Sequence, residues 1–213
     1  GEEKNDTEFA KKLASFGEIF VSDAFGTVHR AHASTEGVSH DLPGYAGFLI
    51  EKELSVMGGA LDEPKRPFVA VLGGAKVSDK IGVISNLIEK ADTIIVGGGM
   101  AYTFLKAEGK EVGKSLLEAD KVELARGLMK KALDNDVMFL LPVDIVVADH
   151  FAADAEKMTV DTEEIPADWM GMDIGFETVE LFKAAILKAG TVVWNGPMGV
   201  FEFPAFADGT KAV

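Results

Sequence analysis

Three short apolar runs in this sequence each end in a cluster of glycines. Runs of this kind are typical of buried strands, and the carboxyl ends of parallel strands meet at one edge of a sheet, where open α/β sheets bind ligands. Glycines at that edge lack a Cβ atom and let a ligand approach the backbone. The pattern therefore predicts a nucleotide lying across three loops. In chain order the loops are Leu72-Gly-Gly-Ala-Lys76, Val96-Gly-Gly-Gly-Met100 and Trp194-Asn-Gly-Pro-Met-Gly199.

From residue 67 onward, apolar runs alternate with helical patterns. Such alternation is typical of an α/β fold, in which helices cover both faces of a mostly parallel sheet. The stretch 144–161 fits the alternation poorly, and its two runs of β-forming residues, 145–148 and 157–160, predict an inserted hairpin. The other predicted strands are 68–72, 93–96, 137–141 and 191–194, and the predicted helices are 77–89, 100–107, 116–134 and 178–189.

The first part of the chain is organised differently and ends in a charged segment with two prolines, residues 61–67. That composition is typical of a domain boundary. The preceding pattern predicts a helix at 7–16, a strand at 18–22 and a helix at 45–57, which Gly58-Gly59 would end. We therefore expect three parts, which are the end of one domain at residues 1–45, a connecting helix and linker at 46–66, and a second domain at 67–213.

Charge and composition argue against several classes of function. With 35 Asp and Glu against 21 Lys and Arg, the formal net charge is −14, whereas nucleic-acid binders hold phosphates with clustered cations. No apolar run approaches the roughly 20 residues that cross a bilayer, and the acidic start of the chain is unlike a signal peptide. The lack of cysteine fits a reducing compartment. We therefore expect a cytoplasmic protein with no nucleic-acid or membrane partner.

Two lysines follow the first glycine loop. Lys76 and Lys80 are four residues apart, so on a helix both ammonium groups would lie on one face, beside the positive N-terminus. Two cations there repel each other unless an anion joins them, and lysine serves phosphate as a mobile point charge. The pattern favours contact with a polyphosphate, although taken alone two solvated surface lysines explain the spacing equally well.

A second group of basic residues lies between Asp23 and Ser34. His29, Arg30 and His32 fall within four residues of an otherwise acidic chain. The Arg30 guanidinium could fork onto a carboxylate or a phosphate, whereas a lone histidine is more often a simple surface or core residue. No acidic cluster with metal-ligand spacing accompanies the histidines, so we expect no metal site formed by the protein. The lack of a nucleophile elbow argues against covalent catalysis.

None of the three loops carries a standard nucleotide fingerprint. The sequence lacks G-x-x-x-x-G-K-[ST] and G-x-G-x-x-G, so neither a Walker-type NTPase nor a nicotinamide oxidoreductase is supported by its own motif. Each loop taken alone also has a structural explanation as a tight turn or a helix cap. The argument for a nucleotide therefore rests on the three loops sharing one edge.

Four longer stretches resemble, in this order, signatures of the phosphoglycerate kinase family: DAFGTVHRAHAS, GGAKVSDKI, VGGGMAYTFLK and VVWNGPMGVFE. The resemblance runs through nearly the whole chain. It implies a Rossmann-like nucleotide domain preceded by the tail of the phosphoglycerate-binding domain. It also implies reversible phosphoryl transfer from 1,3-bisphosphoglycerate to ADP, giving ATP and 3-phosphoglycerate in glycolysis. Mg²⁺ would be carried by the ADP or ATP, and the parent enzyme would be a monomer.

The resemblance also implies roles for individual residues. Arg30 would grip the phosphoglycerate, with His29 and His32 adding positive character nearby. Lys76 would meet the transferring phosphoryl group, and Lys80 would bind the nucleotide phosphates. The other residues expected along the nucleotide cleft are Gly74, Ala75, Gly97, Gly98, Asn195, Pro197, Gly199 and Val200, with Gly171 and Met172 near the adenine and Glu202 at the ribose hydroxyls.

The extent of the chain departs from the family pattern. Family members are longer, with an N-terminal half-domain that supplies most of an arginine patch and a final glycine-rich turn with a metal-binding aspartate. We therefore expect a central fragment that retains the nucleotide face and has little or no turnover of its own. The alternative interpretation is a non-catalytic, truncated or engineered nucleotide-binding module.

Overall fold

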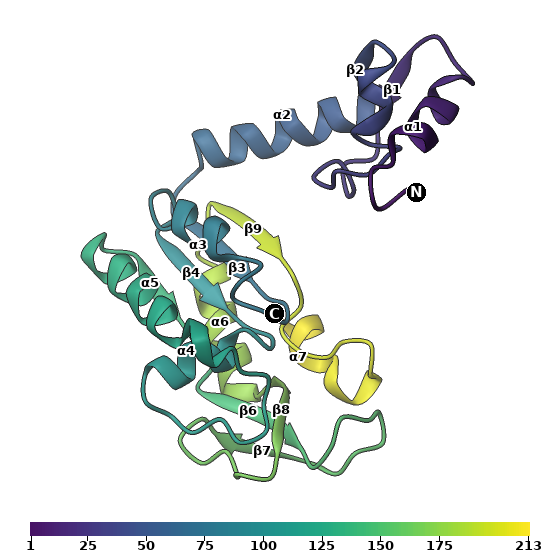
Figure 1. The fold of residues 1–213 in the computed structure, drawn as a ribbon. Helices are drawn as coiled ribbons and strands as arrows, with labels where there is room; N and C mark the ends of the chain where they lie inside the picture. Colours follow the sequence, from purple (N-terminus) through teal and green to yellow (C-terminus); the bar gives the residue numbers. More distant parts are fainter. The chain divides into compact units, whose positions relative to one another are not determined.

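The computed structural model describes all residues from 1 to 213 and divides into two units, Gly1–Glu63 and Pro64–Val213. In the first unit two short strands run parallel, with Phe20 opposite Gly44 (Figure 1). The helix predicted at 7–16 and the strand predicted at 18–22 are confirmed with shorter bounds. The elements of this unit are α1 (Thr7–Ala14), β1 (Phe20–Ser22), the 3-10 helix η1 (Gly37–His40), β2 (Gly44–Ala46) and α2 (Phe48–Asp62).

Helix α2 begins and ends later than the sequence pattern predicted. Its start is fixed by Asp23, whose carboxylate accepts hydrogen bonds from the backbone N–H groups of Leu49 (2.7 Å) and Ile50 (3.0 Å). The prediction that Gly58-Gly59 would end the helix was wrong. Glycine weakens a helix interior by only about 1 kcal/mol relative to alanine, so the helix continues until Pro64 is near.

The second unit is an α/β domain built on a four-stranded parallel sheet, as the alternation of patterns predicted. The strand order is β5-β4-β3-β9, and helices cover both faces of the sheet (Figure 1). Its elements outside a second sheet are β3 (Phe68–Leu72), α3 (Ile81–Leu87), β4 (Thr93–Val96), α4 (Ala101–Ala107), η2 (Ala119–Lys121), α5 (Val122–Asp134), β5 (Met138–Leu140), α6 (Phe176–Ile186), β9 (Thr191–Asn195), η3 (Pro204–Phe206) and α7 (Asp208–Ala212).

Side chains on both faces of this sheet are buried. Val69, Val71 and Ile95 pack against α6, including its fully buried Phe182. On the opposite face Phe104 of α4 contacts Phe139 of β5, with ring centroids 5.3 Å apart. Burial on both faces explains why the strands appear in the sequence as continuous apolar runs rather than as an alternation of apolar and polar residues.

The strand register brings the three glycine loops to one edge of the sheet. Leu72 at the end of β3 lies opposite Val96 of β4 and Asn195 of β9. Because the three strands are parallel, the loops that follow them emerge side by side. The sequence-based prediction of a shared edge is confirmed.

A second, three-stranded sheet is inserted after β5. Strands β6 (Asp144–Ala148) and β7 (Lys157–Asp161) form the predicted antiparallel hairpin. Strand β8 (Met170–Ile174) pairs with the other side of β6 and was not predicted. Its sequence, Met-Gly-Met-Asp-Ile, has one β-branched residue and a glycine, so it carries little strand propensity.

Two helices begin later than the periodicity of their apolar residues predicted. Helix α3 starts at Ile81 rather than at 77, and α5 starts at Val122 rather than at 116. Contacts outside the helices hold the residues before them, since Val77 is buried in the core and Glu118 accepts hydrogen bonds from Ser78. None of the helices is long and apolar enough to span a membrane.

Candidate nucleotide-binding site

Backbone hydrogen bonds join the three glycine loops at the sheet edge. The N–H of Gly74 donates to the carbonyl of Pro197 (3.2 Å), and the N–H of Gly98 donates to the carbonyl of Met198 (2.9 Å). The approach is close enough to require glycine, because a Cβ atom at Gly73 would lie 2.0 Å from the Pro197 carbonyl oxygen. Gly74 and Gly98 also have φ angles of 117° and 67°, which residues with side chains rarely adopt. The loops therefore form one connected backbone frame.

This frame forms one wall of a cavity of about 470 Å³ in the second unit. The structure brings most of the residues expected along a nucleotide cleft to this cavity. It places four of the expected residues outside the lining, which are Gly97, packed against the Met198 side chain, together with Lys76, Lys80 and Asn195. The expected residues that line the cavity are Gly74, Ala75, Gly98, Gly171, Met172, Pro197, Gly199, Val200 and Glu202.

Sequence analysis missed several lining residues, of which Tyr102 of α4 is the most informative. Tyr102 is only 4% exposed, and its hydroxyl fills the space beside Gly171, where a Cβ atom would lie 1.9 Å from the hydroxyl oxygen. Burial, together with the nearby charge of Asp173, raises the pKa of Tyr102 far above its usual value, so the phenol stays neutral. The other missed residues are Lys114, Leu116, Phe151 and Met170, whereas Gly99 and Met198 lie within two of the predicted loops without having been singled out.

The wall around Tyr102 is largely apolar. Leu116, Met170 and Met172 line it, and Phe151 contributes an aromatic ring from the loop between β6 and β7. The Phe151 ring contacts the ring of Phe203, with centroids 5.1 Å apart, so two loops at this wall brace each other. A wall of this kind suits a flat, largely apolar ring system such as a nucleobase. The sequence alone does not show that these residues line a cavity, because apolar residues also fill the core of any domain.

Asp173 of β8 is a buried carboxylate next to the cavity wall. Its two oxygens accept hydrogen bonds from the backbone N–H groups of Ile174 (2.9 Å) and Gly209 (2.8 Å), which tie β8 to α7. Burial raises the pKa of Asp173 to about 6, although these two hydrogen bonds and the charge of Lys157 act in the opposite direction. A Cβ atom at Gly199 would lie 2.2 Å from an Asp173 oxygen, so the carboxylate packs directly against a cavity-lining loop.

The two lysines after the first loop lie on a turn rather than on the helix. Sequence analysis placed Lys76 and Lys80 on one face of a helix, which was wrong, because α3 begins at Ile81 and Lys80 is its N-cap residue. The Lys80 ammonium donates to the side-chain oxygen of Asn195, and this hydrogen bond joins the turn after the first loop to the third loop. Lys76 directly follows the lining residue Ala75, and its side chain is exposed. Both lysines therefore follow the glycine frame closely in the chain, and neither lines the cavity.

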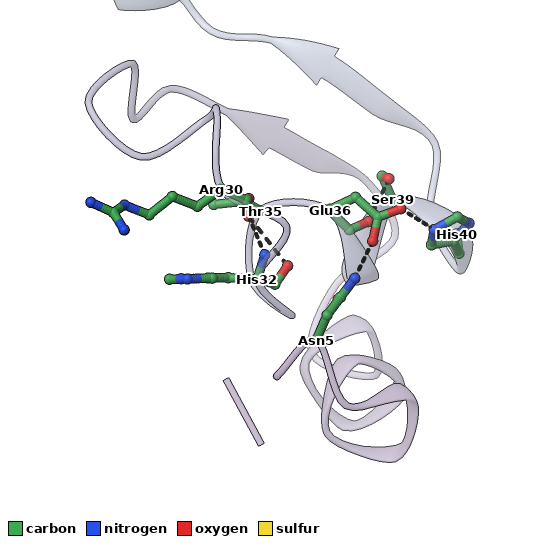
Figure 2. A network of polar contacts seen from close by, with 7 residues as sticks. All are labelled: Asn5, Arg30, His32, Thr35, Glu36, Ser39 and His40. Carbon is green, nitrogen blue, oxygen red and sulfur yellow. Dashed lines mark hydrogen bonds and ion pairs between the residues drawn. The ribbon is translucent and has the colours of Figure 1, made fainter. Parts of the chain in front are cut away.

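The basic residues of the first unit lie in a turn that follows β1. His29 and Arg30 are exposed and His32 is half-buried. The Thr35 hydroxyl donates to the Arg30 carbonyl (2.6 Å) and accepts from the His32 N–H (3.1 Å), which fixes the backbone of this turn. Figure 2 shows the side chains of Arg30 and His32 extending to the same side.

A separate polar network lies on the other side of that turn (Figure 2). Asn5 and His40 both hydrogen-bond to the Glu36 carboxylate. The hydrogen bond from Asn5, followed by the one from His40, lowers the pKa of Glu36 below its usual value. Arg30 takes no part in this network, and its guanidinium extends away from Glu36 (Figure 2).

Comparisons with known proteins agree with the fold and with the motifs. The sequence model of the phosphoglycerate kinase family matches residues 1–213. The chain is 60% identical to phosphoglycerate kinases of Pelotomaculum thermopropionicum and Acidobacterium capsulatum, and the matches cover 100% of this chain but 54% and 53% of those proteins. The chain thus spans about half the length of the curated relatives it matches.

Solved structures show the same likeness. The phosphoglycerate kinase of Coxiella burnetii matches with a TM-score of 0.81 and 45% identity over 100% of this chain and 55% of that one. The enzyme of Pyrococcus horikoshii matches with a TM-score of 0.75 and 32% identity over 98% of this chain and 54% of that one. With the family match over its whole length, this chain belongs to the phosphoglycerate kinase family.

Proposed function

We propose that residues 64–213 bind an adenine nucleotide and that the protein serves phosphoryl transfer between 1,3-bisphosphoglycerate and ADP. The observation that carries the proposal is the cavity at the sheet edge, which combines the glycine frame with an apolar wall and whose lining residue Ala75 directly precedes Lys76. Membership in a family whose matched relatives are phosphoglycerate kinases supports the same assignment.

The apolar wall is the proposed place of the adenine. Gly171 and Met172 run along this wall, and neutral Tyr102 packs behind Gly171, so the base would lie against backbone and apolar side chains. Glu202 also lines the cavity, and its carboxylate is suited to accept hydrogen bonds from two ribose hydroxyls.

The glycine frame and the two lysines are the proposed place of the phosphates. Lys76 would neutralise the charge of the phosphoryl group in transfer. Lys80 would bind the other phosphates, and its hydrogen bond to Asn195 could either break or persist when it does so. Phosphoryl transfer passes through a loose transition state, so it needs alignment and neutralisation of charge more than covalent help. The backbone frame supplies alignment, because its loops are tied to one another by hydrogen bonds.

Mg²⁺ would arrive with the nucleotide. Among residues 1–213, no group of three or more His, Cys, Asp or Glu side chains could hold a metal ion. Delivery with the nucleotide would suit Mg²⁺, which is usually bound by one or two carboxylates together with phosphate oxygens and water. When bound, the ion would neutralise phosphate charge, and the residues of this chain would orient the nucleotide around it.

The first unit is the proposed contributor to binding of the acid substrate. The exposed guanidinium of Arg30 can pair in a fork with a carboxylate or a phosphate, and His29 and His32 would add positive charge when protonated. We accordingly assign residues 1–45 to the end of the phosphoglycerate-binding domain, 46–66 to a connecting helix and linker, and 67–213 to most of the nucleotide domain. We also propose a cytoplasmic location, which fits the lack of cysteine, and a monomeric parent enzyme, which rests on the family resemblance.

Calorimetric titration of the 213-residue chain with Mg-ADP tests the nucleotide assignment. We expect saturable binding that Lys80→Ala weakens about ten-fold or more, because a charge-assisted contact contributes about 1.5 to 3 kcal/mol. Lys188→Ala is the matched control, since it removes the same charge from an exposed position that does not line the cavity. Absence of binding, or equal weakening by both variants, would contradict the assignment.

A further inference from the structure

Residues 113–118, between α4 and η2, form a segment that runs along the cavity wall and is fixed at both ends. At its first end the N–H of Lys114 donates to the carbonyl of Trp169 (2.7 Å). The Ser115 hydroxyl accepts a hydrogen bond from the N–H of Gly171 (2.9 Å), a residue of the apolar wall. Leu116, in the middle of the segment, lines the cavity. This end of the segment therefore supports the proposed base site.

The other end of the segment holds the turn that carries the two lysines. One oxygen of the Glu118 carboxylate accepts from the Ser78 hydroxyl (2.6 Å), and the other accepts from the Ser78 N–H (3.0 Å). The neighbouring N–H of Val77 also favours the ionised form of the carboxylate. The backbone N–H of Glu118 donates to the buried Thr103 hydroxyl of α4 (3.2 Å), so the carboxylate is itself anchored to the core.

The Glu118 side chain is ionised at neutral pH. Partial burial opposes ionisation, but the hydrogen bonds from the Ser78 hydroxyl and from the N–H groups of Ser78 and Val77 outweigh it and lower the pKa of Glu118. An ionised carboxylate accepts on both oxygens, so it can take the Ser78 N–H and the Ser78 hydroxyl at the same time.

The residues that Glu118 holds lie between the two lysines. Lys76 precedes Val77 directly, and the N–H of Lys80 donates to the Val77 carbonyl (2.9 Å). The Val77 side chain is fully buried, so the middle of the turn is fixed, while the Lys76 side chain is exposed and the Lys80 ammonium donates to the Asn195 side chain. Without the carboxylate, the backbone N–H of Ser78 just before α3 would lose its partner, because helix starts leave such groups unpaired.

We propose that Glu118 is a positioning residue for phosphate binding, which fixes the turn 76–80 so that both lysines meet the nucleotide phosphates. The proposal rests on the nucleotide assignment made above and adds a residue that touches no part of the nucleotide. Binding of the base depends on the other end of the same segment, through Ser115 and Leu116. Loss of the Glu118 carboxylate should therefore affect phosphate and base binding differently.

Glu118→Ala tests the proposal through the binding of two ligands, Mg-ADP and adenosine, measured by calorimetry. We expect the Kd for Mg-ADP to rise about ten-fold and the Kd for adenosine to change by less than about two-fold, because adenosine carries no phosphate. Glu118→Gln keeps one acceptor oxygen and should give an intermediate loss. Glu111→Ala is the matched control, since it removes an exposed carboxylate from the same loop and should change neither Kd.

Hydrogen exchange of the unliganded chain tests the structural half of the proposal without any nucleotide. In Glu118→Ala the amides of Val77 and Ser78 should exchange about ten-fold faster, with little change in the strands of the parallel sheet. Failure of the wild-type chain to bind Mg-ADP would overturn the nucleotide assignment, and the exchange rates would still decide whether Glu118 holds the turn. Equal weakening of ADP and adenosine, or unchanged exchange at Val77 and Ser78, would overturn the role of Glu118.

Discussion

The apolar wall of the cavity and the turn that carries the lysines are built in different ways. The wall is made by packing: Tyr102 and Met172 are 4% and 3% exposed, and Gly171 fits against the Tyr102 hydroxyl. The turn is made by a few polar contacts at the surface, chiefly Lys80 with Asn195 and Glu118 with Ser78. One region depends on shape, and the other depends on charge.

This difference determines how each region should respond to change. A packed wall cannot be altered without loss of stability, because close-packed groups resist added volume. Exposed ammonium groups contribute little to stability, so changes there can alter ligand affinity while the fold persists. The two regions can therefore be distinguished experimentally, by substitutions at the wall and by the effect of salt on binding at the lysine turn.

The largest effect is expected for Gly171→Ala at the apolar wall. Its Cβ atom would lie 1.9 Å from the Tyr102 hydroxyl oxygen, so the Tyr102 ring, which is only 4% exposed, would have to shift. We expect the free energy of unfolding to fall by about 3 kcal/mol, and the binding of ADP and adenosine to be lost together. Chemical denaturation and calorimetry measure the two effects.

Gly82→Ala is the control for that substitution. Gly82 lies in α3, and a Cβ atom there would have no neighbour within 4 Å. Alanine in a helix is favoured over glycine by about 1 kcal/mol, so this variant should be at least as stable as the wild type. If Gly171→Ala proved as stable as Gly82→Ala, the wall would not be the tightly packed region described above.

A second, comparable effect concerns pH and Asp173. Its pKa is raised from 3.8 to about 6, so the stability gained from the protonated form is complete below pH 3.8 and is lost as the pH rises through about 6. A shift of this size corresponds to about 3 kcal/mol. Relative to Asp173→Asn, the wild type should therefore lose about this much unfolding free energy between acidic and neutral pH. Urea denaturation at a series of pH values gives the unfolding free energy of both proteins. Parallel pH profiles would contradict the raised pKa of Asp173.

A smaller effect is expected from salt at the lysine turn. Raising the ionic strength screens exposed charges, because the Debye length falls from about 10 Å at 0.1 M to about 3 Å at 1 M salt. The affinity for Mg-ADP should fall several-fold over this range, whereas the affinity for adenosine should not fall, since its proposed wall is apolar. Calorimetry in both salt conditions makes the comparison, and equal salt dependence would show that charge does not separate the two regions.

Much of the fold could be predicted from the sequence because its strands are buried on both faces. Strands 68–72 and 93–96 were predicted with their observed bounds, since continuous apolar runs bounded by glycine are a strong local signal. Strand β8 was missed because its order comes from pairing with β6 rather than from its own residues. The late starts of α3 and α5 depend on contacts such as Glu118 with Ser78, between residues 40 positions apart, which no local pattern can reveal.

The candidate site could be predicted to a similar extent and for related reasons. Glycines that must approach other backbone groups, such as Gly74 and Gly98, mark the frame in the sequence. Tyr102 and Phe151 did not stand out, because an apolar residue beside a cavity looks the same in a sequence as one in the core. Gly171 and Met172 were expected only through the family resemblance, since the strand that carries them has no signal of its own.

The central claim is that the base and the phosphates of one nucleotide occupy these two regions of the second unit. Amide chemical-shift mapping of the isotope-labelled chain, titrated with adenosine and then with Mg-ADP, tests it most directly. We predict that both ligands shift the amides of Gly171 and Gly199, and that only Mg-ADP shifts those from Ala75 to Lys80. Shifts confined to residues 1–63, or an adenosine response as large at Lys80 as at Gly171, would contradict the claim.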